Sequence, residues 1–191
     1  MKIIKLIKLI YLLFSSHSYG FYKGHKYLNK SQLNVILSDL NSDIDNNTVL
    51  SNYEEKFASY VGSGKCISFA AARMAFYALM KSLSIDKGSE VIITGFTCAV
   101  MANAVIRTGA NIIYADIDPK NYGSSYQDIK NKITPRTKMI VAQHTFGVPC
   151  DIKKISTLCN SLGIFLLEDC ALSFDSKCED KKLGNYGDAA I

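Results

Sequence analysis

Short apolar runs alternate with amphipathic stretches along most of this 191-residue chain. Apolar runs bounded by polar or turn residues predict buried strands, whereas apolar residues spaced three and four apart predict helices with one buried face. Strands are predicted at 65–70, 90–94, 111–117, 138–146 and 164–170. Helices are predicted at 31–40, 49–62, 72–85, 98–108, 126–133 and 151–163, with Gly109 and Gly163 placed to end two of them.

Strands that are separated by amphipathic helices indicate an α/β fold. The expected architecture is a mostly parallel sheet with helices on both faces. No internal repeat or low-complexity linker interrupts the chain after residue 30, so residues 31–191 are predicted to form one domain.

Residues 1–30 form a separate, basic segment in this interpretation. Lys2, Lys5 and Lys8 recur every three residues, which suits one face of an amphipathic helix over residues 1–14 that the mature protein keeps. A basic start followed by apolar and small residues also resembles a secretory signal peptide, and this alternative stays open. The uninterrupted apolar stretch, IYLLF, is too short to span a bilayer.

Composition narrows the class of protein further. Hydrophobic residues make up 48% and charged residues 20%, as in ordinary globular proteins. The net charge of +5 comes from scattered basic residues, so no nucleic-acid partner is predicted. The six cysteines include no CxxC pair and the three histidines lie far apart, which favours free thiols in the cytoplasm over disulfides or a zinc site.

Two adjacent acids, Glu168 and Asp169, end the apolar run in LLEDCALSF. In open α/β sheets, ligands bind beyond the carboxyl ends of the strands. The other predicted strand exits, at 69–73, 94–98 and 143–147, share that edge if the strands are parallel. We therefore expect Asp169 to face a crevice where an acid can meet a cationic ligand.

Five motifs, in order, carry a resemblance that covers about Tyr53 to Ile191. They are EEKFASYVGSGKCISF, AARMAFYAL, GSEVIITGFTCAVMANAVIRTGANIIYADID, ITPRTKMIVAQHTFGVPCDI and LLEDCALSFDSKCEDKKLGNYGDAAI. Together they resemble the N-terminal part of the DegT-type sugar aminotransferases. The resemblance implies an incomplete large domain of the aspartate-aminotransferase fold (fold type I), with the C-terminal small domain absent.

The same resemblance implies a cofactor and partners. Members of this family use pyridoxal 5′-phosphate to aminate keto groups of nucleotide-linked sugars, with an amino donor such as glutamate. They form active sites between two subunits, which implies a homodimer. The sugar and the donor are not specified by the sequence.

Residue by residue, Asp169 matches the acid that pairs with the protonated ring nitrogen of the cofactor, which keeps the ring an electron sink. Glu168 is expected to be structural. Ala72 and Arg73 match the helix start that holds the phosphate. Cys98 stands where many members place a stacking aromatic ring, and His144 falls on the family's His position near the cofactor.

Departures from the family pattern leave the activity of this chain open. Leu172 stands where the family has Gln or His to bond the phenolic oxygen, and Leu has no such group. The Schiff-base lysine follows GDAA by about ten residues in the family, and none of the residues up to Ile191 matches it. The chain alone is therefore expected to be inactive. A dehydratase of the same family and a non-enzymatic remnant are the alternatives.

Overall fold

The computed structural model describes residues 29–39, 45–62 and 64–191. The predicted N-terminal helix and its alternative, the signal peptide, lie outside these residues. Contacts within the chain divide it into two units, Met1–Val49 and Leu50–Ile191. Helix α2 (Lys30–Asp39) belongs to the first unit, and α3 (Asn46–Val61) extends from the first unit into the second. Both confirm helices predicted from the sequence.

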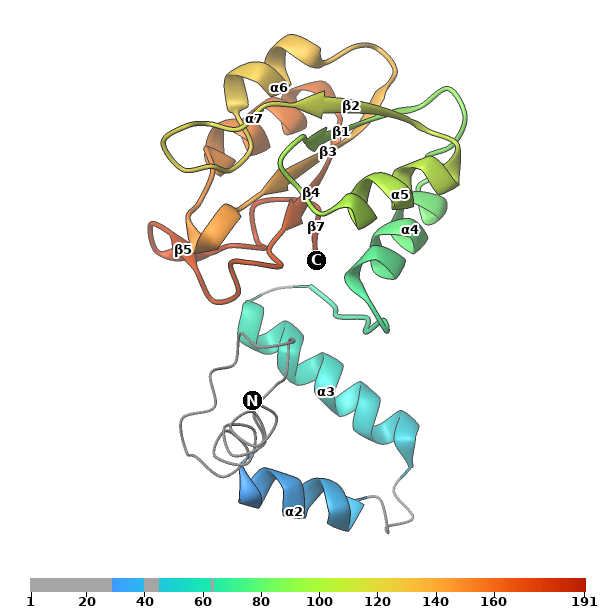
Figure 1. Ribbon diagram of the computed structural model, residues 1–191, viewed down its shortest axis with the longest axis vertical. Helices are drawn as coiled ribbons and strands as arrows, with labels where there is room; N and C mark the ends of the chain where they lie inside the picture. Colours follow the sequence, from blue (N-terminus) through green and yellow to red (C-terminus); the bar gives the residue numbers. More distant parts are fainter. Residues whose placement is uncertain (1–28, 40–44, 63) are drawn as a thin grey trace, which may run out of the picture. The chain divides into compact units, whose positions relative to one another are not determined.

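Five parallel strands form the sheet of the second unit (Figure 1). Their order is β2-β1-β3-β4-β7, and every neighbouring pair is parallel. The strands are β1 (Glu90–Thr94), β2 (Asn111–Ala115), β3 (Thr137–Gln143), β4 (Phe165–Asp169) and β7 (Ala189–Ala190). A separate hairpin of two short strands, β5 (Lys177–Cys178) and β6 (Lys181–Lys182), precedes β7 in the sequence. The mostly parallel α/β architecture is thus confirmed.

Helices cover the two faces of this sheet. One core cluster joins α4 (Ala72–Ser82) and α5 (Ala99–Thr108) to alternate residues of the strands, such as Val141 and Leu167. The other cluster joins α6 (Tyr126–Lys132) and α7 (Ile152–Leu162) to the strand residues that alternate with those of the first cluster, such as Leu166. Because side chains of a strand alternate between faces, consecutive residues at a strand exit face different helices.

Glycines end two of the helices, as predicted. Gly109 after α5 has φ 87° and Gly163 after α7 has φ 65°, both in the left-handed conformation that suits residues without a Cβ. No helix among the described residues is both long and apolar enough to cross a membrane.

Two predicted strands differ from the structure. The strand predicted at 138–146 ends at Gln143, because a 3-10 turn, η1 (Thr145–Gly147), follows and places Phe146 at φ 55°. The strand predicted at 65–70 is wrong: within the described chain no backbone group of this segment pairs with another backbone group. An apolar run becomes a strand only where a neighbouring strand offers its free edge, and the described residues supply none beside this segment.

Candidate functional site

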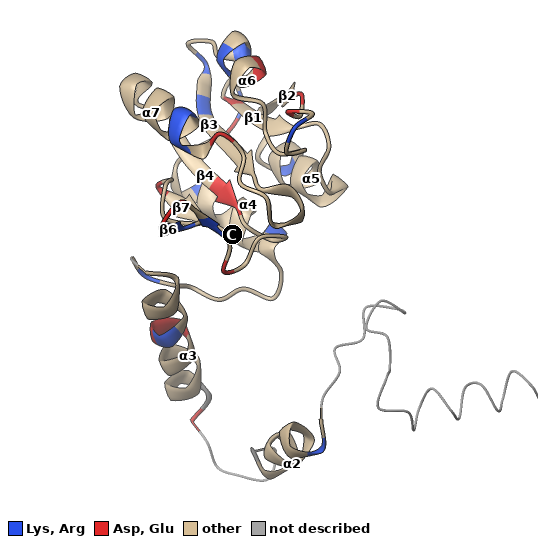
Figure 2. Cartoon of the chain, turned by 90° about the vertical axis from the view of Figure 1, so that its left-hand side faces the viewer, with Lys and Arg blue, Asp and Glu red and all other residues tan. Residues whose placement is uncertain are grey.

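Two acids lie at the carboxyl end of β4 (Figure 2). Their hydrogen-bond partners differ. Asp169 lies two residues after Leu167, so its side chain is on the α4/α5 face of the sheet. It is 8% exposed, and the only hydrogen bond that its carboxylate makes within the described chain comes from the N–H of Ala171 to Oδ1, at 3.1 Å. Burial raises the pKa of Asp169, and the hydrogen bond from the N–H of Ala171 only partly offsets this effect.

Glu168 is turned to the opposite face and is completely buried. Its Oε1 accepts hydrogen bonds from the N–H groups of Tyr186 and Gly187, at 2.6 and 2.7 Å. Its Oε2 accepts one from the N–H of Gly184 at 2.9 Å and lies 3.1 Å from Nε2 of His144. Burial opposes ionisation, but these hydrogen bonds outweigh it and lower the pKa of Glu168. The expected structural role of Glu168 fits this geometry.

His144 is buried with no exposed surface. Its Nδ1 accepts a hydrogen bond from the N–H of Cys150 at 3.3 Å, so the ring proton is on Nε2 and is donated to Glu168. Both ring nitrogens are therefore used inside the protein. This arrangement favours an indirect role for His144, through the shape of the site, over direct contact with a ligand.

His144, Glu168 and Cys170 also form a cluster whose ligand atoms lie within 4.8 Å of one another. The cluster has the residue types of a metal site. However, the hydrogen bonds described above already occupy Glu168 and both nitrogens of His144. This network needs no ion to satisfy its polar atoms.

Two helices begin on the same face of the sheet as Asp169. Helix α4 begins at Ala72, after Ala71, and α5 begins at Ala99, after Cys98. Neither helix has a side-chain cap, and the N–H groups of Ala72 and Arg73 make no hydrogen bond within the described chain. Free N–H groups and the helix dipole together favour an anion at such a helix start.

The remaining site residues predicted from the sequence are more exposed to solvent than Asp169. Arg73 lines a groove between α4 and α5, together with Arg107. Cys98 is exposed at the start of α5. Leu172, in the loop after β4, is 59% exposed. No hydrogen bond or ion pair within the described chain joins these three side chains to Asp169.

Gln143 was not singled out from the sequence, although it ends β3 directly beside Asp169. Its Nε2 donates to the carbonyl of Phe96 at 2.9 Å and to Oγ1 of Thr145 at 3.0 Å. It thereby fixes the loop that leads to Cys98. The sequence signal that could have identified Gln143 is a polar residue directly after the apolar run MIVA.

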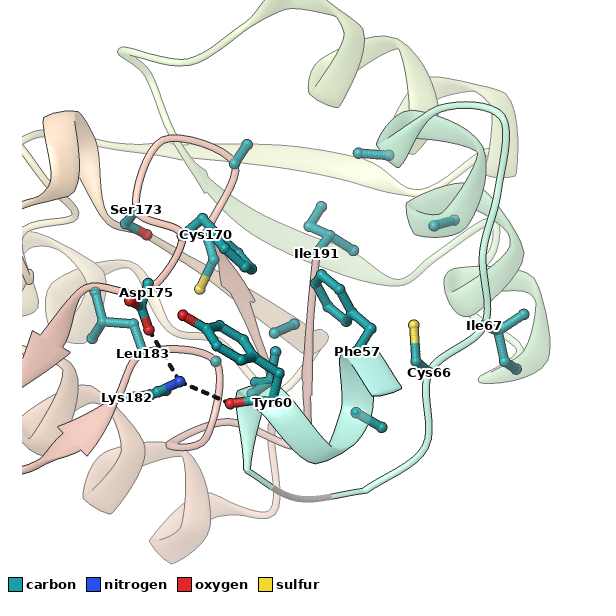
Figure 3. Close-up of a pocket in the computed structure, with 18 of the residues that line it drawn as sticks. Phe57, Tyr60, Cys66, Ile67, Cys170, Ser173, Asp175, Lys182, Leu183 and Ile191 are labelled. Atoms are coloured by element: carbon teal, nitrogen blue, oxygen red, sulfur yellow. Dashed lines mark hydrogen bonds and ion pairs between the residues drawn. The ribbon is translucent and has the colours of Figure 1, made fainter. Parts of the chain in front are cut away.

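A cavity of about 470 Å³ adjoins this edge of the sheet (Figure 3). Ala72 and Ala171 are in its wall, but Asp169 is not. Its other walls come from α3, from residues 65–69 and from the strand β7. Asp169 therefore lies near this cavity but does not line it.

Known proteins of similar sequence match most of this chain. The GDP-perosamine synthase of Escherichia coli O157:H7 is 36% identical over 141 residues, which cover 72% of this chain and 39% of that protein. The GDP-perosamine synthase of Vibrio cholerae is 32% identical over 157 residues, covering 79% of this chain and 43% of that protein. The chain thus spans less than half the length of these relatives.

Solved structures show the same fold. The aminotransferase TlmJ from Streptoalloteichus hindustanus has a TM-score of 0.80 and 26% identity, covering 86% of this chain and 46% of that one. PseC from Helicobacter pylori has a TM-score of 0.78 at 23% identity, covering 86% of this chain and 45% of that one. The fold is therefore that of fold-type I aminotransferases. The model of the DegT/DnrJ/EryC1/StrS aminotransferase family matches residues 29–191, and the chain belongs to this family.

Proposed function

We propose that this chain supplies the cofactor-binding part of a pyridoxal-phosphate-dependent aminotransferase that acts on a nucleotide-linked keto sugar. The proposal rests on the burial and the hydrogen bonding of Asp169. It is a buried acid with a raised pKa and one hydrogen bond, directly beside an acid whose oxygens are all engaged. A buried carboxylate with so few partners is suited to a cationic ligand.

Asp169 would hold the ring nitrogen of pyridoxal phosphate. A carboxylate that accepts a charge-assisted hydrogen bond from this nitrogen keeps it protonated. When bound, the cofactor then supplies an electron sink for the amino-group transfer. Burial strengthens this pairing because little water competes for the carboxylate.

The start of α4 would hold the phosphate. The N–H groups of Ala72 and Arg73 are free donors, and the guanidinium of Arg73 adds a positive charge near them. Cys98 would lie against the ring from the start of α5, where a thiol offers less surface for stacking than an aromatic side chain. Gln143 would act indirectly, by fixing the loop before Cys98.

Leu172 is an apolar contact in this scheme and does not hydrogen-bond to the cofactor. His144 and Glu168 act together as a positioning pair beneath the end of β4. The amino donor is proposed to be glutamate and the assembly a homodimer, both by family resemblance. All six cysteines lack disulfides, which suits the reducing cytoplasm.

The test uses a chimera in which this chain is joined to the downstream part of the E. coli O157:H7 synthase that it does not match. The chimera receives ¹⁵N-glutamate and a nucleotide-linked keto sugar, and mass spectrometry follows ¹⁵N in the sugar. We expect transfer in the chimera and in Asp151→Asn, a control at a half-exposed acid that pairs with Lys154. Asp169→Asn should lower the rate at least a hundredfold. A chimera that binds the cofactor but transfers no ¹⁵N would refute the aminotransferase assignment.

A further inference from the structure

Three buried polar residues from three segments of the chain meet where β1 and β3 end. Thr94 ends β1, Gln143 ends β3, and Ser124 lies in the loop between β2 and α6. Thr94 is 2%, Ser124 0% and Gln143 8% exposed. Buried hydroxyl and amide groups need hydrogen-bond partners, so the partners of these three residues define how this part of the sheet is held.

Ser124 joins the ends of the two strands. β1 and β3 are neighbours in the sheet (Figure 1), and their pairing in the described chain ends at Ile92 and Ile140. Beyond it, the N–H of Gln143 donates to Oγ of Ser124 at 2.8 Å, and the N–H of Ser124 donates to the carbonyl of Gln143 at 3.2 Å. Oγ of Ser124 also lies 2.5 Å from Oγ1 of Thr94. One hydroxyl therefore links the end of β1 to the end of β3.

The loop that carries Ser124 packs closely against β3. Gly123 precedes Ser124, and a Cβ at Gly123 would lie 2.8 Å from the carbonyl oxygen of Gln143 and 2.9 Å from Cβ of Cys150. Neither of these atoms is the far end of a flexible side chain, so any side chain at position 123 would push the loop away from the strand. This close contact and the hydrogen bonds are independent signs that the position of Ser124 is fixed.

The hydrogen bonds connect the two faces of the sheet. Thr94 lies two residues after Ile92, which belongs to the core cluster of α6 and α7, so its side chain is on that face. Gln143 lies two residues after Val141, which belongs to the core cluster of α4 and α5, so its side chain is on the face of the candidate site. The backbone of Gln143 thus joins the hydroxyls of Thr94 and Ser124 to an amide on the opposite face.

On the face of the candidate site, the amide of Gln143 holds two loops. It donates to the carbonyl of Phe96 at 2.9 Å, in the loop that leads to Cys98, and to Oγ1 of Thr145 at 3.0 Å. Thr145 begins η1, in which Phe146 has φ 55°, a strained conformation for a residue with a side chain. Such a conformation persists only where the surrounding structure enforces it. The position of Gln143 therefore governs both loops.

We propose that Ser124 and Thr94 are positioning residues of the cofactor site. They fix the end of β3 from the far face of the sheet and, through Gln143, hold the loop that carries Cys98 at the start of α5. A ring that lies against Cys98 then meets a wall whose position is already set, so binding does not have to order this loop. The inference rests on the proposed function, because that function assigns a cofactor to this edge of the sheet.

The experiment measures binding of 4-deoxypyridoxine 5′-phosphate, a cofactor analogue, by calorimetry. Ser124→Ala removes the shared hydroxyl, and Thr94→Val removes one of its partners with little change in shape. Both variants should bind about fivefold more weakly than the wild type. Thr94→Ser keeps a hydroxyl and should retain the affinity. Thr108→Val is the matched control: it loses a buried hydroxyl that donates to the carbonyl of Val105 at 2.7 Å, at the other end of α5, and should bind like the wild type.

Hydrogen–deuterium exchange without ligand gives a second measurement. The amides of Gly95 and Met101 are hydrogen-bonded on either side of the Cys98 loop. In Ser124→Ala they should exchange about tenfold faster, whereas the amides of α7 should be unchanged, because the loop opens without unfolding of the whole protein. A merely structural role of Ser124 would speed exchange in both places.

Equal affinities of Ser124→Ala and the wild type, or exchange that rises equally beside Cys98 and in α7, would overturn the inference and leave the proposed function standing. If Ser124→Ala does not fold, the comparison of Thr94→Val with Thr94→Ser decides in the same way. No binding to the wild type would contradict the proposed function itself, and this inference with it.

Discussion

Glu168 and Asp169 are consecutive residues of β4, yet the carboxylate of Glu168 accepts four hydrogen bonds and that of Asp169 accepts one within the described chain. The alternation of a strand sends the two side chains to opposite faces of the sheet. The first is bound into the protein itself, and the second keeps the capacity to bind something else. This difference predicts opposite effects of two conservative substitutions.

Glu168→Gln should destabilise the fold strongly. The amide loses the charge and turns N–H donors toward the N–H groups of Gly184, Tyr186 or Gly187. The loss of a buried, hydrogen-bonded charge costs about 3 kcal/mol of unfolding free energy. Urea unfolding at pH 7 measures this difference, and a loss below about 1 kcal/mol would contradict the structural role.

The pH dependence of stability tests the same residue. Hydrogen bonds lower the pKa of Glu168 below its ordinary value of 4.5, so its contribution is fully present above pH 4.5. It is lost as the pH falls through the lowered pKa. The unfolding free energy of the wild type should therefore fall more steeply below pH 4.5 than that of Glu168→Gln.

Asp169→Asn should leave the free protein at least as stable as the wild type at pH 7. Because burial raises the pKa of Asp169 above 3.8, the folded state holds its proton more tightly than the unfolded state. The stability linked to this proton is present below pH 3.8 and is lost as the pH rises through the raised pKa. Asn does not ionise, so the variant does not lose stability in this way as the pH rises. Denaturant unfolding at pH 7 checks this, and a destabilisation as large as that of Glu168→Gln would show that Asp169 is structural.

Gly187 should tolerate no side chain. A Cβ there would lie 2.6 Å from the carbonyl oxygen of Leu166 and 3.2 Å from its Cγ. Gly187→Ala should therefore cost about 3 kcal/mol, as for overpacking against a rigid backbone. Gly163→Ala is the control: nothing lies within 4 Å of its Cβ, so only the strain of its positive φ remains, about 1 kcal/mol. Equal losses for the two variants would contradict the close packing of this turn.

Cysteine reactivity tests the placement of Cys98. Burial raises the pKa of Cys159 and that of Cys170 to about 12, so both should alkylate slowly, whereas Cys98 is exposed and should react first. 4-Deoxypyridoxine 5′-phosphate lacks the aldehyde that reacts with surface lysines, and it should slow alkylation of Cys98 if the ring lies against it. Peptide mass spectrometry measures the rates, with Cys178 as the control. Equal protection of Cys98 and Cys178 would count against the proposed ring position.

The sequence predicted local structure well where local physics decides it. The five-residue strand at 90–94 and the glycine ends of two helices agree with the structure because burial and positive φ depend on a few neighbouring residues. The strand prediction for residues 65–70 was wrong because a strand also needs a partner strand, which no local pattern reveals. The exit of β4 was predicted as chemically important, but the sequence alone did not reveal that His144 is enclosed by Glu168 and Cys150.

The most direct test of the central claim is calorimetric titration of 4-deoxypyridoxine 5′-phosphate into this chain, into Asp169→Asn and into Asp151→Asn. The account predicts saturable binding at one site per chain, retained in Asp151→Asn. Asp169→Asn should bind at least tenfold more weakly, which corresponds to about 1.4 kcal/mol. Equal affinities of all three proteins, or no saturable binding to any of them, would contradict the assignment of Asp169 to the cofactor.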